Sequence, residues 1–63
     1  MALFKVKLER VEDGKVVQLD YLYVRARDTK EGYRDARKRA LAVVTSAWPG
    51  TKLWRATDCN CVG

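Results

Sequence analysis

Cationic and apolar side chains recur at helical spacing between residues 30 and 48. At about 100° per residue, a helix here would gather several of them within a sector of about 60°. The set is Lys30, Arg34, Arg37, Leu41 and Trp48, with Lys38 beside it. Guanidinium and ammonium groups bind phosphates and carboxylates, and a Trp can anchor a protein contact. We therefore expect a surface that binds an acidic or phosphate-bearing partner; the alternative is a solvated helix face, with Trp48 folded over the edge of the core.

The titratable residues do not predict catalysis. The chain contains no histidine, which removes the commonest general base and the commonest zinc ligand. Its Asp and Glu residues fall in no recognisable catalytic constellation, and no Ser or Thr has a histidine base. We therefore expect a protein that is not an enzyme and that uses no cofactor.

Cys59 and Cys61 form a Cys-x-Cys pattern near the C-terminal end. A redox dithiol usually has Cys-x-x-Cys spacing beside a helix N-terminus, and a structural zinc site has four ligands. The pattern meets neither requirement, so we expect reduced thiols in a flexible tail. An intermolecular disulfide or a bridging metal ion is the alternative.

The size and charge of the chain narrow the class of protein. A chain of 63 residues forms one small domain, and its formal net charge is +5. Such a charge favours nucleic acid, a nucleoprotein or an acidic protein face as partner, although charge that serves solubility gives the same composition. No apolar run approaches the ~20 residues that a membrane span needs, and residues 1–9 lack the pattern of a signal peptide. We expect a cytoplasmic protein with no membrane partner.

The elements that must position these residues begin with a β-hairpin. Residues 3–11 alternate between apolar and polar, which is the period of a half-buried strand, and residues 16–26 are rich in β-branched and aromatic side chains. Asp13-Gly14 between them predicts a two-residue type I′ turn. This turn implies a register that puts one apolar set on the core side of the sheet. The set is Phe4, Val6, Leu8, Val17, Leu19, Tyr21 and Tyr23.

The other side of the predicted sheet stays open. Its residues include Lys5, Lys7, Leu22, Val24 and, as a further candidate, Trp54. Exposed apolar groups beside cations often mark contacts, so we expect a second contact patch at Lys5 and Lys7 or a homodimer formed through this face; ordinary scattered surface residues are the alternative. Because the register places Tyr21 and Tyr23 inside, it disfavours stacking on single-stranded nucleic acid. A one-residue slip would exchange the two sides.

A helix is predicted after the hairpin. Asp28 or Thr29 can cap its first turn, and the Pro49-Gly50 pair ends it near residue 47. Asp35 and Arg39 have the spacing of an i, i+4 ion pair. Small and apolar residues form its inward stripe, which is Gly32, Tyr33, Ala36, Ala40, Val43, Val44 and Ala47.

A third strand over residues 51–57 follows the helix, and residues 58–63 are expected to be a tail. A right-handed crossover returns this strand antiparallel to the first, beside which we expect it to pair. The predicted fold is α+β. It is a single two-layer β-β-α-β domain over residues 1–57, with a mainly antiparallel three-stranded sheet in the order 2-1-3 and one helix packed on one face.

Residues 16–57 also carry a recurrent pattern of residues that begin and end secondary-structure elements. Val24-Arg-Ala-Arg ends the second strand, Asp28-Thr29 caps the helix, alanines recur at Ala36 and Ala40, and Trp48-Pro-Gly-Thr51 precedes the last strand. The pattern resembles small phage and mobile-element proteins of β-β-α-β type, among them anti-CRISPR inhibitors of bacterial surveillance complexes. The resemblance implies a protein that acts without catalysis, by occupying the surface with which a nucleoprotein complex grips its nucleic acid. It assigns no individual residue, and the +5 charge argues against phosphate mimicry.

We therefore predict a non-enzymatic, phage-type binding protein that docks on a host protein or nucleoprotein complex and inhibits it. Its contact residues would be Lys30, Arg34, Arg37, Lys38, Leu41 and Trp48, with Lys5 and Lys7 as a second patch. Direct, sequence-tolerant binding of DNA or RNA through the same cations is the runner-up. A structural or assembly subunit that dimerises through the open sheet face is the third hypothesis.

Overall fold

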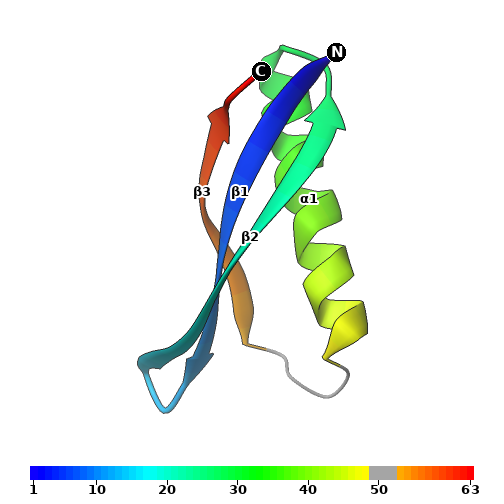
Figure 1. Cartoon of the computed structure of the whole chain (residues 1–63). Coiled ribbons are helices and arrows are strands. Elements are labelled where there is room, and N and C mark those ends of the chain that lie inside the picture. Colours follow the sequence, from blue (N-terminus) through cyan, green and yellow to red (C-terminus); the bar gives the residue numbers. More distant parts are fainter. Residues whose placement is uncertain (49–52) are drawn as a thin grey trace.

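Three strands and one helix make up the fold in the computed structural model, which describes residues 1–48 and 53–63. The elements are β1 (Ala2–Glu12), β2 (Lys15–Ala26), α1 (Lys30–Ala47) and β3 (Trp54–Cys61). The sheet has the order β2-β1-β3, and β1 pairs antiparallel with both neighbours. The helix lies along one face of the sheet and leaves the other face open (Figure 1). The predicted α+β fold, β-β-α-β with strand order 2-1-3, is confirmed.

A two-residue turn joins β1 to β2, as predicted. Asp13 has a φ of 51° and Gly14 a φ of 75°, and a type I′ turn needs positive φ at both central positions. The strands first pair as this turn dictates, but the register shifts between Arg10 and Val11. Val17 therefore has no partner on β1 and forms a β-bulge, in which one strand holds an extra residue.

The bulge places the rest of β2 on the opposite face from the one predicted. Leu22 and Val24 lie on the helix side and pack against the core. Tyr21, Tyr23 and Leu19 lie on the open side, with 46%, 59% and 53% of their surface exposed. The prediction that these three residues are buried and that Leu22 and Val24 are exposed was therefore wrong.

The close approach of the helix explains why the tyrosines face outward. The buried residues of α1 are Gly32, Ala36, Ala40 and Val44. Three of these four residues have little or no side chain, which lets the helix lie close to the sheet. Tyrosine rings in the layer beneath would need more space, and their hydroxyls would need buried hydrogen-bond partners. Leu22 and Val24 fill the same layer with smaller, wholly apolar side chains.

The core is centred on β1, whose fully buried large side chains are Phe4, Val6 and Leu8. Tyr33 of α1 packs edge-on against Phe4, with the ring centroids 4.6 Å apart. Val43 and Ala47 were predicted in the inward stripe but are exposed. The hairpin twists away from the C-terminal half of α1 (Figure 1), so the sheet does not cover these positions.

The ends of α1 are fixed by local hydrogen bonds. Thr29, one of the two predicted caps, accepts a hydrogen bond from the backbone N–H of Gly32 at 3.1 Å. At the other end, the backbone N–H of Trp48 donates to the carbonyl of Val44 at 3.0 Å. The predicted helix stop at Pro49-Gly50 lies outside the described residues.

The third strand reaches farther along the chain than predicted. Residues 58–61, expected to be a tail, are part of β3 and pair with the segment Phe4–Lys7 of β1. Beyond the strand, the backbone N–H of Val62 donates to the carbonyl of Leu3 at 2.7 Å. The backbone N–H of Leu3 donates to the carbonyl of Gly63, also at 2.7 Å. The polar segment is ordered because it pairs with a central strand whose second edge would otherwise be unpaired there.

Trp54, a predicted candidate for the open face, lies on the core side with 7% of its surface exposed. The register of β3 shifts between Lys7 and Leu8, which leaves Thr57 without a partner on β1. This second bulge exchanges the faces of β3 and turns Trp54 inward. The predicted start of the strand at residue 51 lies outside the described residues.

Candidate binding surfaces

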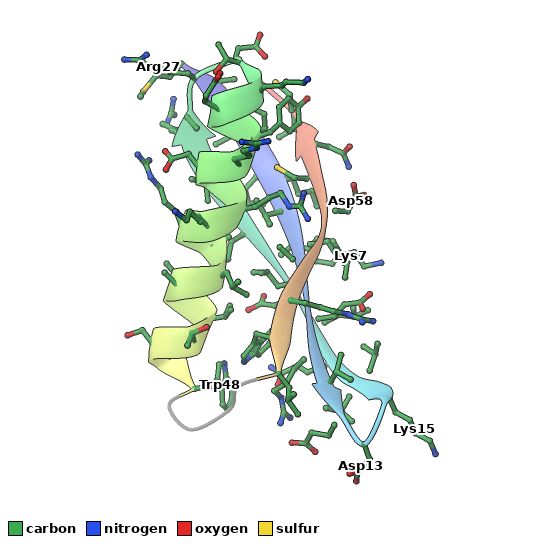
Figure 2. The ribbon with its side chains drawn as sticks, turned by 180° about the vertical axis from the view of Figure 1, so that it is seen from behind. Lys7, Asp13, Lys15, Arg27, Trp48 and Asp58 are labelled. Atoms are coloured by element: carbon green, nitrogen blue, oxygen red, sulfur yellow. The ribbon has the colours of Figure 1, made fainter. Side chains whose placement is uncertain are left out.

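Two tyrosines and two lysines alternate across the open face of the sheet. In the register of β1 and β2, Lys5 lies opposite Tyr23 and Lys7 lies opposite Tyr21. The Lys5 ammonium also reaches diagonally over the Tyr21 ring, at 4.7 Å from its centroid, within the range of a cation–π interaction. Figure 2 shows Lys7 directed away from the helix. The helix does not cover this face, so the rings and the ammonium groups are accessible together.

Further charges frame this surface, which we call the tyrosine face and define by Lys5, Lys7, Tyr21 and Tyr23. The register adds Arg25 and Arg55 from the two edge strands, and the carboxylates of Glu9 and Asp58. Glu9 has 14% of its side chain exposed and lies 3.0 Å from the Arg55 guanidinium and 4.0 Å from the Lys7 ammonium. Glu9 is thus largely covered by the cations beside it, whereas Asp58, Arg25 and Arg55 are exposed.

The predicted cations of the helix gather beside β3. Arg34, Arg37, Lys38 and Leu41 line a hollow of about 510 Å³ together with Trp54, Arg55 and Ala56. The Arg37 guanidinium donates to the carbonyl of Ala56 at 3.1 Å and so ties the helix to β3. Four of the predicted helix residues thus lie around one hollow, and their contact with a partner stays a prediction. Arg55 was missed, because its position depends on the bulge in β3.

Lys30 and Trp48 do not line this hollow. They flank the helix, which is about 27 Å long at 1.5 Å per residue. Figure 2 shows Trp48 at the end of the helix remote from Arg27, which precedes the helix. Trp48 has 46% of its surface exposed. Lys30 lies one turn before Arg34, whereas Trp48 follows the last turn, so the two residues lie at opposite ends of α1.

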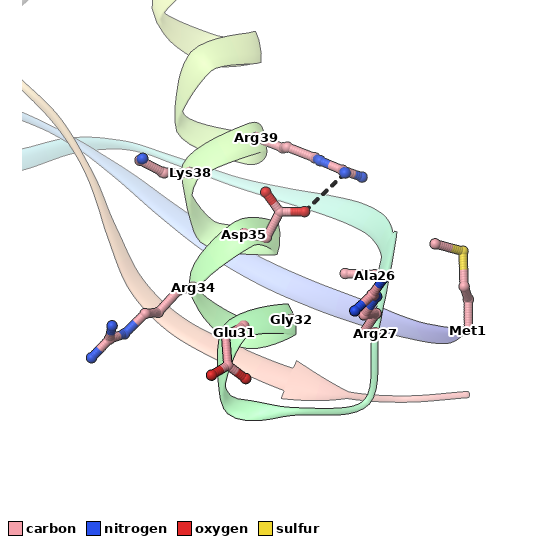
Figure 3. A pocket seen from close by; sticks show the side chains of 9 residues that line it. All are labelled: Met1, Ala26, Arg27, Glu31, Gly32, Arg34, Asp35, Lys38 and Arg39. Atoms are coloured by element: carbon pink, nitrogen blue, oxygen red, sulfur yellow. Dashed lines mark ion pairs between the residues drawn. The ribbon is translucent and has the colours of Figure 1, made fainter.

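The opposite flank of the helix carries compensated charge. A hollow of about 590 Å³ there is lined by residues that include Glu31, Asp35 and Arg39 (Figure 3). Asp35 and Arg39 form the predicted i, i+4 ion pair at 2.8 Å. Arg39 also donates to the carbonyl of Arg25 on β2 at 3.1 Å. Arg39 is thus held by an acid and by the backbone, and the carboxylates of Glu31 and Asp35 make this flank a weaker site for an anion, although Arg34 and Lys38 line this hollow too.

The two thiols lie on β3 and not in a tail. Cys59 is half-buried and packs against the core, whereas Cys61 is exposed, and both are free. Burial raises the pKa of Cys59, and the nearby Arg37 opposes this shift. No group of three or more His, Cys, Asp or Glu residues that could hold a metal ion occurs within the described part of the chain.

A search for helices that could cross a membrane, made over residues 1–48 and 53–63, found none that is long and apolar enough. Comparison of the chain with protein-family models, with curated proteins and with solved structures gave no match.

Proposed function

We propose that this protein binds single-stranded nucleic acid across its tyrosine face. Tyr21 and Tyr23 would stack on successive bases, while Lys5 and Lys7 would contact the phosphates between them. Exposed aromatics on an open sheet are a common way of holding unpaired bases, and a cationic surround supplies the attraction to the backbone. The observation that carries the proposal is the exposure of Tyr21 and Tyr23, 46% and 59% of their surface, on strand positions next to the two lysines.

The charge of the face favours nucleic acid over a second copy of the chain. The open face carries the cations of Lys5, Lys7, Arg25 and Arg55 against the carboxylates of Glu9 and Asp58, so two copies packed face to face would each bring a net positive charge. Like charges at close range in a partly dry interface repel strongly. A single strand of nucleic acid has the opposite effect, because phosphates pair with those ammonium groups and release counterions.

Unpaired bases fit this face better than a duplex does. The rings of Tyr21 and Tyr23 can stack only on bases whose faces are free, and the bases of a duplex already stack on one another. Nothing in this arrangement reads base edges, so we expect little preference for sequence. This choice develops the runner-up hypothesis of the sequence analysis. Docking of a phage-type inhibitor on a host protein stays a prediction, and a pull-down from lysate with and without nuclease separates the two.

Fluorescence anisotropy with labelled single-stranded RNA and DNA of mixed sequence tests the proposal. Loss of one stacked base costs about 1–3 kcal/mol, so Tyr21→Ala and Tyr23→Ala should each weaken binding about 5- to 150-fold. Tyr21→Phe and Tyr23→Phe keep the ring and should bind almost as the unaltered protein does.

The charges are tested in the same assay. Lys7→Gln should lower the slope of log K against log salt by about 0.7, the share of one phosphate contact in a single strand. Lys15→Gln is the matched control, because Lys15 lies at the hairpin end of β2, away from the tyrosine face. The proposal is overturned if both alanine variants bind like the unaltered protein, or if a duplex competes as well as a single strand.

A further inference from the structure

We infer that the bound strand does not end on the tyrosine face but turns around the β3 edge into the hollow between α1 and β3. This inference rests on the proposed function and extends it to a second phosphate-binding segment. The hollow would take a phosphodiester backbone together with at least one base or sugar.

The first observation is an unbroken series of contacts around the sheet edge. Glu9 on the open face lies 4.0 Å from the Lys7 ammonium and 3.0 Å from the Arg55 guanidinium. Arg55 in turn lines the hollow on the other side of β3. Arg55, 60% of whose side chain is exposed, therefore belongs to both surfaces and joins them.

The second observation is the uncompensated charge at the hollow. Neither Arg34 nor Lys38 forms an ion pair with a described residue, and Arg37 is bonded to a backbone carbonyl. On the other flank of the same helix, Arg39 is paired with Asp35 at 2.8 Å. Arg34 and Lys38 line the hollows on both flanks of the helix, so these two cations lie between them and are available to a strand that arrives beside β3.

The third observation concerns the residues at the bottom of the hollow. Leu41, Trp54 and Ala56 give the hollow an apolar base beneath the cations. A surface that combines cations at the rim with apolar contacts at the floor suits a nucleotide, which presents phosphate on one side and a flat base on the other. At about 510 Å³ the hollow is within the range of ligand-sized cavities.

A length series of oligothymidylates, from about 4 to 16 nucleotides, tests the inference by anisotropy. The shortest oligomers should occupy the tyrosine face alone, and longer ones should bind more tightly as they reach the hollow. In Arg34→Gln/Lys38→Gln this gain with length should disappear. The salt slope for the longest oligomer should fall by about 0.7 for each phosphate that the variant no longer binds, while binding of the shortest oligomer should be unchanged.

The matched control is Arg27→Gln/Lys30→Gln, which removes the same charge from exposed positions outside the hollow. Glutamine is a good helix former, so neither pair of changes should unfold α1, and circular dichroism checks this. The inference is overturned if the control pair loses as much affinity for long oligomers as the test pair. It is also overturned if affinity does not rise with length.

These outcomes are distinct from failure of the proposed function, which is read from the effect of Tyr21→Ala on the shortest oligomer. If that oligomer depends on the tyrosine but longer ones bind no more tightly, the proposed binding at the tyrosine face is supported and its extension into the hollow is overturned.

A poly-glutamate peptide serves as a second probe. If Arg34→Gln/Lys38→Gln weakens its binding and leaves every oligonucleotide unaffected, the hollow binds an acidic protein segment and our inference is wrong.

Discussion

The Lys5 ammonium lies 4.7 Å from the centroid of the Tyr21 ring, across the diagonal between β1 and β2. A cation–π contact at an exposed site is worth about 0.5–1 kcal/mol. A double-mutant cycle with Lys5→Gln and Tyr21→Leu should therefore give a coupling energy of that size in urea unfolding. The parallel cycle with Lys15→Gln should be additive, because Lys15 is remote from the ring. A zero coupling for Lys5 would contradict the arrangement of the tyrosine face.

The bulge at Val17 determines which residues of β2 face the helix. Val17 has no partner on β1, and its deletion would leave the neighbouring pairs Arg10–Gln18 and Val11–Val16 in place. Both tyrosines should therefore stay on the open face. Because Val17 is exposed, the deletion should cost no more than about 1 kcal/mol in urea unfolding. A loss of several kcal/mol would mean that the bulge, and not the packing of the core, holds the register.

Gly32 lies where α1 touches the backbone before it. Gly32→Ala improves helix propensity by about 1 kcal/mol, yet its Cβ would meet the Arg27 carbonyl oxygen at 1.6 Å. Overpacking costs about 1–3 kcal/mol or more, so we expect a net loss of stability and a lower Tm. Ala42→Gly at an exposed helix position should also destabilise, by about 1 kcal/mol. A Gly32→Ala variant that is more stable than the unaltered protein would show that the helix can lift from this contact.

The two thiols should differ in reactivity. Because burial raises the pKa of Cys59, its thiol stays protonated to higher pH than an ordinary thiol does. Iodoacetamide at mildly alkaline pH should modify the exposed Cys61 first, and peptide mass spectrometry can follow both sites. The raised pKa adds stability below the ordinary thiol pKa, and this contribution is lost as the pH rises through the raised value. In urea both thiols should react alike; equal rates in the folded protein would contradict the burial of Cys59.

Local sequence patterns predicted much of this fold. Asp13-Gly14 located the turn, Thr29 was among the expected caps, and Asp35 and Arg39 had the spacing of their ion pair. These features depend on residues close in sequence, whose geometry is set by the turn or by the helix period. The direction of β3 followed from the right-handed crossover, and its expected place beside β1 is confirmed.

The faces of the strands could not be predicted in the same way. Both alternating sets of β2 contain apolar residues, so a bulge at Val17 changes the exposed set without an obvious mark in the sequence. One signal was present. Leu22, Val24 and Ala26 suit the thin layer under an Ala-rich helix, whereas tyrosine hydroxyls need water or a partner. The tyrosine face was missed because the predicted register contained no bulge in β2. Arg55 was missed because the bulge at Thr57 determines which residues of β3 lie on each face.

The pairing of Leu3 with Val62 and Gly63 also has a mechanical consequence. The ends of β1 and β3 lie side by side at one end of the sheet (Figure 1). A force that pulls the two termini apart would therefore break the hydrogen bonds of this ladder one after another, like a zipper, and would not load them all in shear. The domain should yield at low force from this end, with β3 leaving the sheet before the hairpin opens.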